Sequence, residues 1–143
     1  MVSVMAESFK VLGKYLVMRD RLYTKTHEWI KVLNDEALVG ITDYAQQKLR
    51  NIVGIELPEL GRRYGKGESM GVIESIKSVE DLYAPVTLEV LEVNRSLEDE
   101  PEKMNKDPYG DGWVAKVKIV NKDELNELLK PEDYARLIEE EEK

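Results

Sequence analysis

The stretch at residues 70–86 constrains the fold more than any other part of the chain. It reads MGVIESIKSVEDLYAPV, and β-branched and aromatic residues lie on both sides of a central lysine, Lys77. Such enrichment favours two strands joined by a turn. Residues 75–78 include no Gly, Pro, Asn or Asp, so we predict a type I turn rather than a turn that requires positive φ. Lys77 is therefore expected at the tip of a hairpin, exposed to solvent.

Further short strands are expected on both sides of this hairpin. Alternating or β-branched apolar residues predict them at residues 29–33, 37–41, 52–57, 86–90 and 113–119. A change in the phase of alternation after Val90 predicts either a β-bulge or burial of both faces of the strand near that residue. Trp29 and Trp113 begin two of these strands and are expected to be largely buried. Many short strands with Gly-rich turns predict a mainly β protein, a sandwich or flattened barrel with peripheral helices.

Capping residues predict short helices around the strands. Thr42 is a suitable N-cap for a helix over residues 43–50, which Asn51 would end. The polar segment at residues 97–108 is expected to be a loop with one helical turn near Pro101.

Two more helices are expected at the C-terminus. Asn121 followed by Glu124 forms a capping-box-like start to the first, and Pro131 opens the second. The acidic run at residues 139–142 is expected to be a frayed and solvated end.

Charge and composition exclude several classes of function. The chain has 143 residues and a net charge of −8, so nucleic acid and anionic membrane surfaces are poor partners. No apolar run approaches the length of a membrane span, and no secretory signal pattern is present. We therefore expect a cytoplasmic protein.

The chain also lacks the residues of common catalytic sites. It has no cysteine, which excludes thiolate nucleophiles and thiolate metal sites. His27 is the single histidine and is expected to be a strand residue partly covered by its neighbours. No nucleophile–base pair or metal constellation is apparent, so the chain is not expected to be an enzyme in its own right.

Several motifs together resemble the glycine cleavage system H protein family. The segment ESIKS at residues 74–78, followed by YAP at residues 83–85, resembles the family's lipoylation site. Other matching segments occur in family order between residues 22 and 138. They are YTKTHEW (23–29), VGITDYAQ (39–46), ELPELG (56–61), EVN (92–94) and NKDPYGDGW (105–113).

The resemblance implies a fold, a cofactor and a set of partners. The fold is the barrel-sandwich hybrid of lipoyl and biotinyl domains, a flattened sandwich of antiparallel sheets with short peripheral helices and C-terminal helices. Lipoic acid is expected in amide linkage on Lys77. The partners are a pyridoxal-phosphate glycine decarboxylase, a tetrahydrofolate-dependent aminomethyltransferase, dihydrolipoyl dehydrogenase and a lipoylating enzyme. The carrier would accept an aminomethyl group from the first, present it to the second and be reoxidised by the third.

The same resemblance suggests three acidic site residues. The loaded arm ends in a primary ammonium, which a carboxylate in a water-excluding cleft would protect. Glu28 and Asp81 are candidates for that carboxylate, and ordinary solvated acids are the competing interpretation. Glu74 resembles a recognition residue for the lipoylating enzyme, although it is equally a surface glutamate.

Some positions depart from the family pattern. Leu88 occupies a position where the family usually has Gly. Its side chain is expected to crowd a neighbouring strand, to change how a lipoylating enzyme docks, or to stabilise its own strand. Arg50 and Gly54 replace a more usual Gly and a bulky apolar residue. Residues 1–21 are expected to be an N-terminal extension, partly disordered or a small hairpin, ahead of a lipoyl-carrier domain at residues 22–143.

Three alternatives stay open at the level of the sequence. H-like carriers also resemble lipoate-binding proteins of sulfur-oxidation complexes of the heterodisulfide-reductase type. An unmodified interaction module in which Lys77 is only structural belongs to a different class. Biotin carriage is disfavoured, because biotinyl sites typically have methionines beside the lysine and Lys77 has none.

Overall fold

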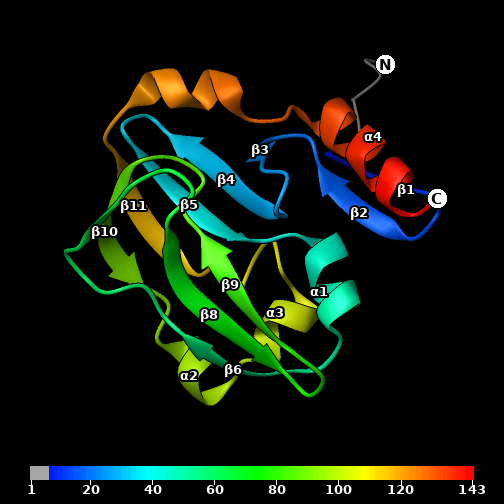
Figure 1. Ribbon diagram of the computed structural model, residues 1–143, viewed down its shortest axis with the longest axis horizontal. Helices are drawn as coiled ribbons and strands as arrows, with labels where there is room; N and C mark the ends of the chain where they lie inside the picture. The colour runs from blue at the N-terminus through cyan, green and yellow to red at the C-terminus, as the bar shows by residue number, and fades with distance from the viewer. Residues whose placement is uncertain (1–6) are drawn as a thin grey trace, which may run out of the picture.

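Three antiparallel sheets form most of the fold in the computed structural model, which describes residues 7–143 (Figure 1). Residues 1–6 of the predicted N-terminal extension therefore lie outside the described residues, and so does any disorder expected there. The strands are β1 (Ser8–Val11), β2 (Tyr15–Met18), β3 (Leu22–Tyr23), β4 (Glu28–Leu33), β5 (Glu36–Ile41), β6 (Ile52–Glu56), β7 (Arg63–Tyr64), β8 (Ser69–Ser75), β9 (Val79–Tyr83), β10 (Leu88–Val93) and β11 (Ala115–Ile119). The helices are α1 (Asp43–Leu49), α2 (Ser96–Asp99), α3 (Lys103–Lys106), the 3₁₀ helix η1 (Lys122–Glu127) and α4 (Pro131–Glu141).

The two larger sheets enclose the core. A six-stranded sheet has the order β3-β4-β5-β11-β10-β7, and a three-stranded sheet has the order β6-β8-β9. Buried side chains from both sheets, such as Val39 and Ile73, belong to one apolar cluster. The predicted flattened antiparallel sandwich is confirmed. No helix within residues 7–143 is both long and apolar enough to span a membrane.

The hairpin predicted around Lys77 is formed by β8 and β9. A serine side chain closes its turn: Ser78 N donates to Ser75 Oγ over 3.2 Å, and Ser75 N donates to Ser78 O over 2.8 Å. No residue from 76 to 78 has positive φ. Because a hydroxyl takes over the capping of the turn, the hairpin needs neither Asn nor Gly.

Glycine at position 71 lets this hairpin pair with β6. A Cβ atom there would lie 2.5 Å from the carbonyl oxygen of Glu56 on the neighbouring strand. A side chain at this position would therefore force β6 and β8 apart. Gly71 thus keeps the base of the hairpin inside a three-stranded sheet, which holds the lysine at a fixed place.

Leu88 fills the core instead of crowding its neighbours. It is fully buried in β10, where it lies opposite Tyr64 on one side and Ile119 on the other. The register between β10 and β11 shifts between Val90 and Glu92, which confirms the predicted bulge. A leucine at this usual glycine position therefore adds buried apolar surface.

Helix α1 begins as predicted and ends one residue early. Thr42 Oγ1 accepts a hydrogen bond from Ala45 N over 3.1 Å, the expected N-cap. The left-handed residue after the helix is Arg50, with φ of 64°, so the prediction that Asn51 would have this role is wrong. Glycine is the residue that adopts such a conformation most easily, which accounts for the family's usual glycine here.

The segments before the C-terminal helix also differ from expectation. Two short helices, α2 and α3, form where one turn was predicted. The segment that starts after Asn121 is the 3₁₀ helix η1 and not an α-helix. Asn121 Oδ1 accepts from Asp123 N, whereas Glu124 accepts hydrogen bonds from Thr87 N and Oγ1 and does not close a capping box. The predicted helix at Pro131 is confirmed as α4, which covers an aromatic cluster beside β1 and β2.

The two tryptophans should differ in their contribution to stability. Trp29 is fully buried, its ring lies against Gly40, and its Nε1 donates to the carbonyl of Pro108 over 3.0 Å. Trp29→Ala should therefore lower the free energy of unfolding by about 3–5 kcal/mol. Trp113 is partly exposed and precedes β11, so the expectation that it is largely buried and begins a strand is wrong. Trp113→Ala should therefore cost less. Urea denaturation of both variants measures this difference, and equal losses would contradict it.

Candidate functional site

Lys77 lies exposed at the tip of the β8–β9 hairpin, as predicted. Ile76 and Val79 beside it are 73% and 64% exposed, an unusual placement for large apolar side chains. Nothing in the tip itself supplies an acid or base to Lys77, so its surroundings decide what it can do.

A cleft of about 560 Å³ begins beside Lys77. Four apolar residues line part of it: Ile41, Ala45, Leu49 and Ile73. The acidic residues Glu28, Glu80, Asp81 and Glu141 also line it. We call this the lysine cleft. It combines an apolar wall, an accessible amine and several carboxylates.

Glu28 is the most deeply buried acid of the lysine cleft, with 2% of the residue exposed. Its Oε1 accepts hydrogen bonds from the hydroxyls of Thr24 and Thr26, and its Oε2 accepts one from Tyr83 N over 3.2 Å. Burial raises the pKa of Glu28 above its ordinary value, and these donors oppose the shift. Among the described residues Glu28 has only neutral partners, so a cation that enters the cleft would meet an acceptor without a counter-charge.

A second hollow, of about 520 Å³, adjoins the lysine cleft. Both hollows are lined by Glu28, Thr26 and Tyr83, which form a shared wall. Lys77 lines the lysine cleft and does not line this second hollow, which makes the lysine cleft the candidate functional site.

The other two predicted acids are placed differently from each other. Asp81 is exposed on β9 and lines the lysine cleft, where its Oδ1 accepts from Ser69 Oγ over 2.9 Å. Glu74 is exposed on β8 outside the cleft, and its carboxylate lies over Gly54 of β6. The structure therefore brings Lys77, Glu28 and Asp81 together and leaves Glu74 apart.

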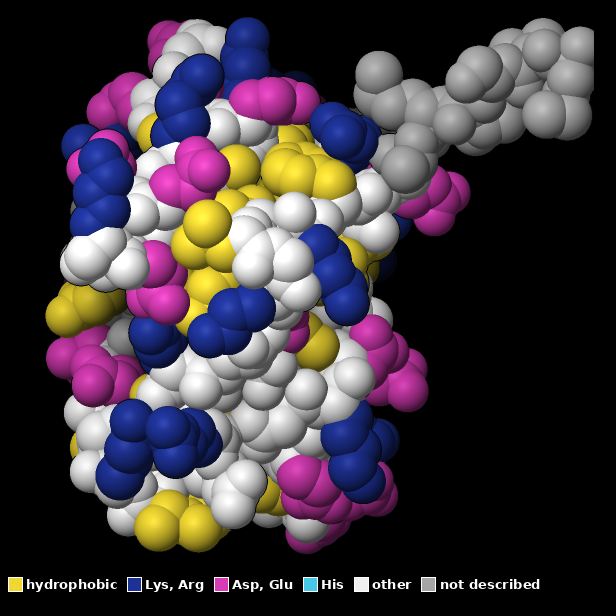
Figure 2. Space-filling model, turned by 90° about the vertical axis from the view of Figure 1, so that its right-hand side faces the viewer, with side chains coloured by type: hydrophobic (Ala, Val, Ile, Leu, Met, Phe, Trp, Pro, Cys, Tyr) yellow, Lys and Arg dark blue, Asp and Glu magenta, His cyan; other side chains and the backbone are white. Residues whose placement is uncertain are grey.

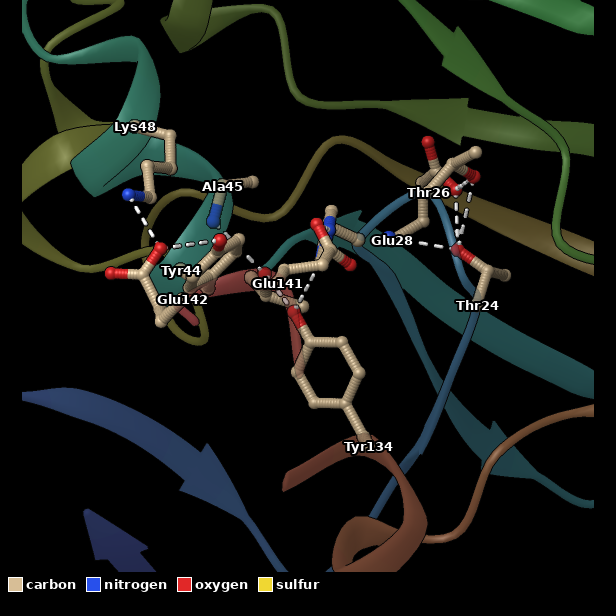
Figure 3. A network of polar contacts seen from close by, with 11 residues as sticks. Thr24, Thr26, Glu28, Tyr44, Ala45, Lys48, Tyr134, Glu141 and Glu142 are labelled. Atoms are coloured by element: carbon tan, nitrogen blue, oxygen red, sulfur yellow. Dashed lines mark hydrogen bonds and ion pairs between the residues drawn. The ribbon is translucent and has the colours of Figure 1, made fainter. Parts of the chain in front are cut away.

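The acidic end of the chain is not frayed, which corrects the expectation for residues 139–142. Glu142 pairs with Lys48 over 2.7 Å and accepts from Tyr44 OH over 2.9 Å (Figure 3). It also accepts from Tyr15 OH over 2.6 Å. The ammonium of Lys48 and the two hydroxyls lower the pKa of Glu142 to about 2. The last turn of α4 is thereby fixed to α1 and to the N-terminal hairpin.

His27 is a turn residue ahead of β4 and not a strand residue, which corrects a second expectation. Its φ is 70°, and its ring lies 4.7 Å from that of Tyr44. Nδ1 lies 2.8 Å from Tyr134 OH, and Nε2 lies 3.0 Å from Glu141 Oε1. Both His27 and Glu141 line the lysine cleft. No sequence signal links them, because 114 positions separate them.

The ionised form of Glu142 should stabilise the fold. Its folded-state pKa lies below the ordinary 4.5, so the stabilisation is present above about pH 4.5 and is lost as the pH falls towards about 2. The difference in urea midpoint between wild type and Glu142→Gln should therefore be large near neutral pH and should shrink across this acid range.

Glu139→Gln is the matched control, because Glu139 is exposed on the same helix. It should follow wild type at every pH. A difference for Glu142→Gln that does not change between neutral and acid pH would contradict this role of its charge.

The fold and the site define a class of protein. Open antiparallel sheets, an exposed lysine at a hairpin tip and a cleft beside that lysine are the features of a carrier domain of the lipoyl and biotinyl type. The family model described as glycine cleavage H-protein matches residues 21–141. The chain therefore belongs to the glycine cleavage H-protein family, whose members are carrier components of the glycine cleavage system.

Individual relatives agree with this assignment. The chain is 53% identical over 126 residues to the glycine cleavage system H protein of Rubrobacter xylanophilus, covering 88% of this chain and 98% of the relative. It is 50% identical over 125 residues to that of Thermus thermophilus, covering 87% and 98%. A crystal structure of a glycine cleavage system H protein from Mycobacterium marinum superposes with a TM-score of 0.81 at 38% identity, covering 86% of this chain and 99% of that one.

Proposed function

We propose that Lys77 carries a lipoyl group and that the lysine cleft receives the loaded arm. The chain would then be a non-catalytic shuttle that accepts an aminomethyl group from glycine decarboxylase and presents it to aminomethyltransferase. Dihydrolipoyl dehydrogenase would reoxidise it. The observation that carries this proposal is that exposed Lys77 and buried Glu28 line the same cleft.

The residues of the cleft fit a lipoyl group. The amine of Lys77 is accessible for amide formation, and the apolar side chains of Ile41, Leu49 and Ile73 suit an aliphatic arm and its ring. When bound, lipoic acid supplies a disulfide that can take up the aminomethyl group. Ser75 and Ser78 hold the turn at the base of this arm, so the point of attachment stays fixed.

Glu28 would bind the ammonium of the loaded arm. The oxidised arm has no positive charge, whereas the aminomethyl form has an ammonium that requires a carboxylate. A charge-assisted hydrogen bond in a shielded site contributes about 1.5–3 kcal/mol. Glu28 is buried and already oriented by Thr24 and Thr26, so little rearrangement is needed. Asp81, exposed on the same cleft, would be a secondary acceptor.

Partner enzymes would dock around the hairpin tip. Ile76 and Val79 offer apolar contacts beside the lysine. Figure 2 looks at the side of the molecule that lies on the right of Figure 1, and basic and acidic side chains alternate there around smaller apolar patches. Glu74, exposed and outside the cleft, suits recognition by a lipoylating enzyme. No feature of residues 7–143 favours the alternative role in sulfur oxidation.

Lys77 should be the single lipoylated residue in protein from its native cells. Intact mass and peptide mapping should locate one lipoyl group on Lys77, because the hairpin exposes this lysine and the family motif surrounds it. Lys77→Arg should abolish lipoylation with an unchanged denaturation midpoint. Lys118→Arg, an exposed lysine on β11, is the control and should be lipoylated like wild type. A lipoyl group on any other lysine would refute the assignment.

Glu28→Gln should shorten the half-life of the loaded carrier. It removes the charge but keeps the size, so fold and lipoylation should survive. The loss of a shielded charged contact corresponds to roughly a tenfold or larger decrease in half-life in buffer. Reoxidation of the empty dihydrolipoyl form should not change, because that form has no ammonium.

The control for this measurement is Glu92→Gln, which changes an exposed glutamate on β10 outside the lysine cleft. It should leave the half-life of the loaded carrier unchanged. Equal half-lives for wild type and Glu28→Gln would mean that Glu28 does not bind the ammonium, and Asp81 would be the next residue to change.

A further inference from the structure

His27 determines how the turn before β4 presents its hydroxyl groups. Its φ of 70° is uncommon for a residue with a side chain, so surrounding contacts must hold it. With this conformation His27 N donates to Thr24 O over 3.2 Å, and Glu28 N donates to Thr24 Oγ1 over 3.0 Å. The turn thereby directs the hydroxyls of Thr24 and Thr26 at one oxygen of Glu28. The arrangement of hydrogen-bond donors around the Glu28 carboxylate therefore depends on the shape of this turn.

A chain of hydrogen bonds fixes the ring of His27. Figure 3 labels Tyr134 and Glu141, which belong to this chain. Thr42 Oγ1 already accepts from Ala45 N, so its own proton is free for Tyr134 OH, 2.7 Å away. Tyr134 then donates to His27 Nδ1 over 2.8 Å. If Tyr134 donated to Thr42 instead, the buried hydroxyl proton of Thr42 would lack an acceptor among the described residues. If His27 Nδ1 donated to Tyr134, the buried hydroxyl proton of Tyr134 would lack one.

It follows that neutral His27 carries its proton on Nε2. This proton points at Glu141 Oε1, 3.0 Å away. The chain of donors therefore runs from α1 through α4 to the imidazole and ends on a carboxylate. Glu141 is the acceptor that completes it.

Glu141 is itself held in place by its neighbour in the sequence. Glu142 binds Tyr15, Tyr44 and Lys48, which anchors the last turn of α4 at the rim of the lysine cleft. The ion pair with Glu142 also neutralises the charge of Lys48, a cation that lines the lysine cleft. An unneutralised Lys48 would repel an ammonium there.

We propose that His27 and Glu141 are positioning residues for Glu28, so that the end of the C-terminal helix helps to build the site for the loaded arm. Glu141 acts on the arm through His27 and the turn at residues 24–28, without touching the ammonium itself. This inference rests on the proposed function of the lysine cleft.

The test compares substitutions of Glu141 in the full-length lipoylated chain. Glu141→Ala removes the acceptor for His27 and should shorten the half-life of the aminomethyl-loaded carrier by about two- to fivefold, the factor expected for one partly exposed charged contact. Glu141→Gln keeps an acceptor oxygen and should restore most of that loss. Glu139→Ala, an exposed glutamate of the same helix, should match wild type. Lipoylation and reoxidation of the empty arm should be the same in all variants.

A double variant separates positioning from direct contact. If Glu141 acts through Glu28, then Glu28→Gln combined with Glu141→Ala should have the half-life of Glu28→Gln alone. A further decrease would mean that Glu141 binds the arm directly, which would overturn the inference. Three other results would also overturn the inference. They are an unchanged half-life for Glu141→Ala, an equal decrease in half-life for Glu139→Ala, and a half-life for Glu141→Gln that is no longer than that of Glu141→Ala.

The single Glu28→Gln variant distinguishes a failure of the positioning role of Glu141 from a failure of the proposed function. If it shortens the half-life and Glu141→Ala does not, only the positioning role is refuted. If Glu28→Gln itself has no effect, the role of Glu28 and the inference built on it both fail.

Discussion

The hydrogen bond from Tyr83 N to the carboxylate of Glu28 is the contact on which the site depends. Glu28 begins β4 in the six-stranded sheet, and Tyr83 ends β9 in the three-stranded sheet, so this bond connects the two sheets beside the lysine cleft. A buried carboxylate is costly unless its oxygens have donors, and here a backbone N–H and two hydroxyls supply them. Because none of these donors is charged, the site retains its attraction for a cation.

The fold separates a fixed base from a reactive group that has to move. Gly71 lets β6 and β8 lie close together, and Ser75 closes the turn, so Lys77 is held at one place on a stiff hairpin. A long arm on this lysine would reach partner enzymes when it extends outwards and Glu28 when it folds back. A carrier with these properties needs no catalytic group of its own.

The C-terminal helix has a larger role than its composition indicates. Its acidic end contacts α1, the N-terminal hairpin and the turn before β4, through Glu142 and Glu141. In aqueous solution four consecutive glutamates repel one another, which favours fraying. Tyrosine hydroxyls, an ammonium and an imidazole offset that repulsion here, and all of them come from distant parts of the chain.

The sequence by itself determined the sandwich of short strands, the exposed hairpin with Lys77, the N-cap at Thr42 and the bulge after Val90, because alternation, capping and turn chemistry are local effects. It also indicated Glu28 and Asp81, through a family resemblance and not through physics. Tertiary structure alone decided that Arg50 adopts the left-handed conformation, that Glu124 bonds to Thr87, and that Glu141 meets His27. Each of these three features depends on a partner distant in the sequence or on the backbone path that packing imposes. No local sequence pattern encodes a distant partner or such a backbone path.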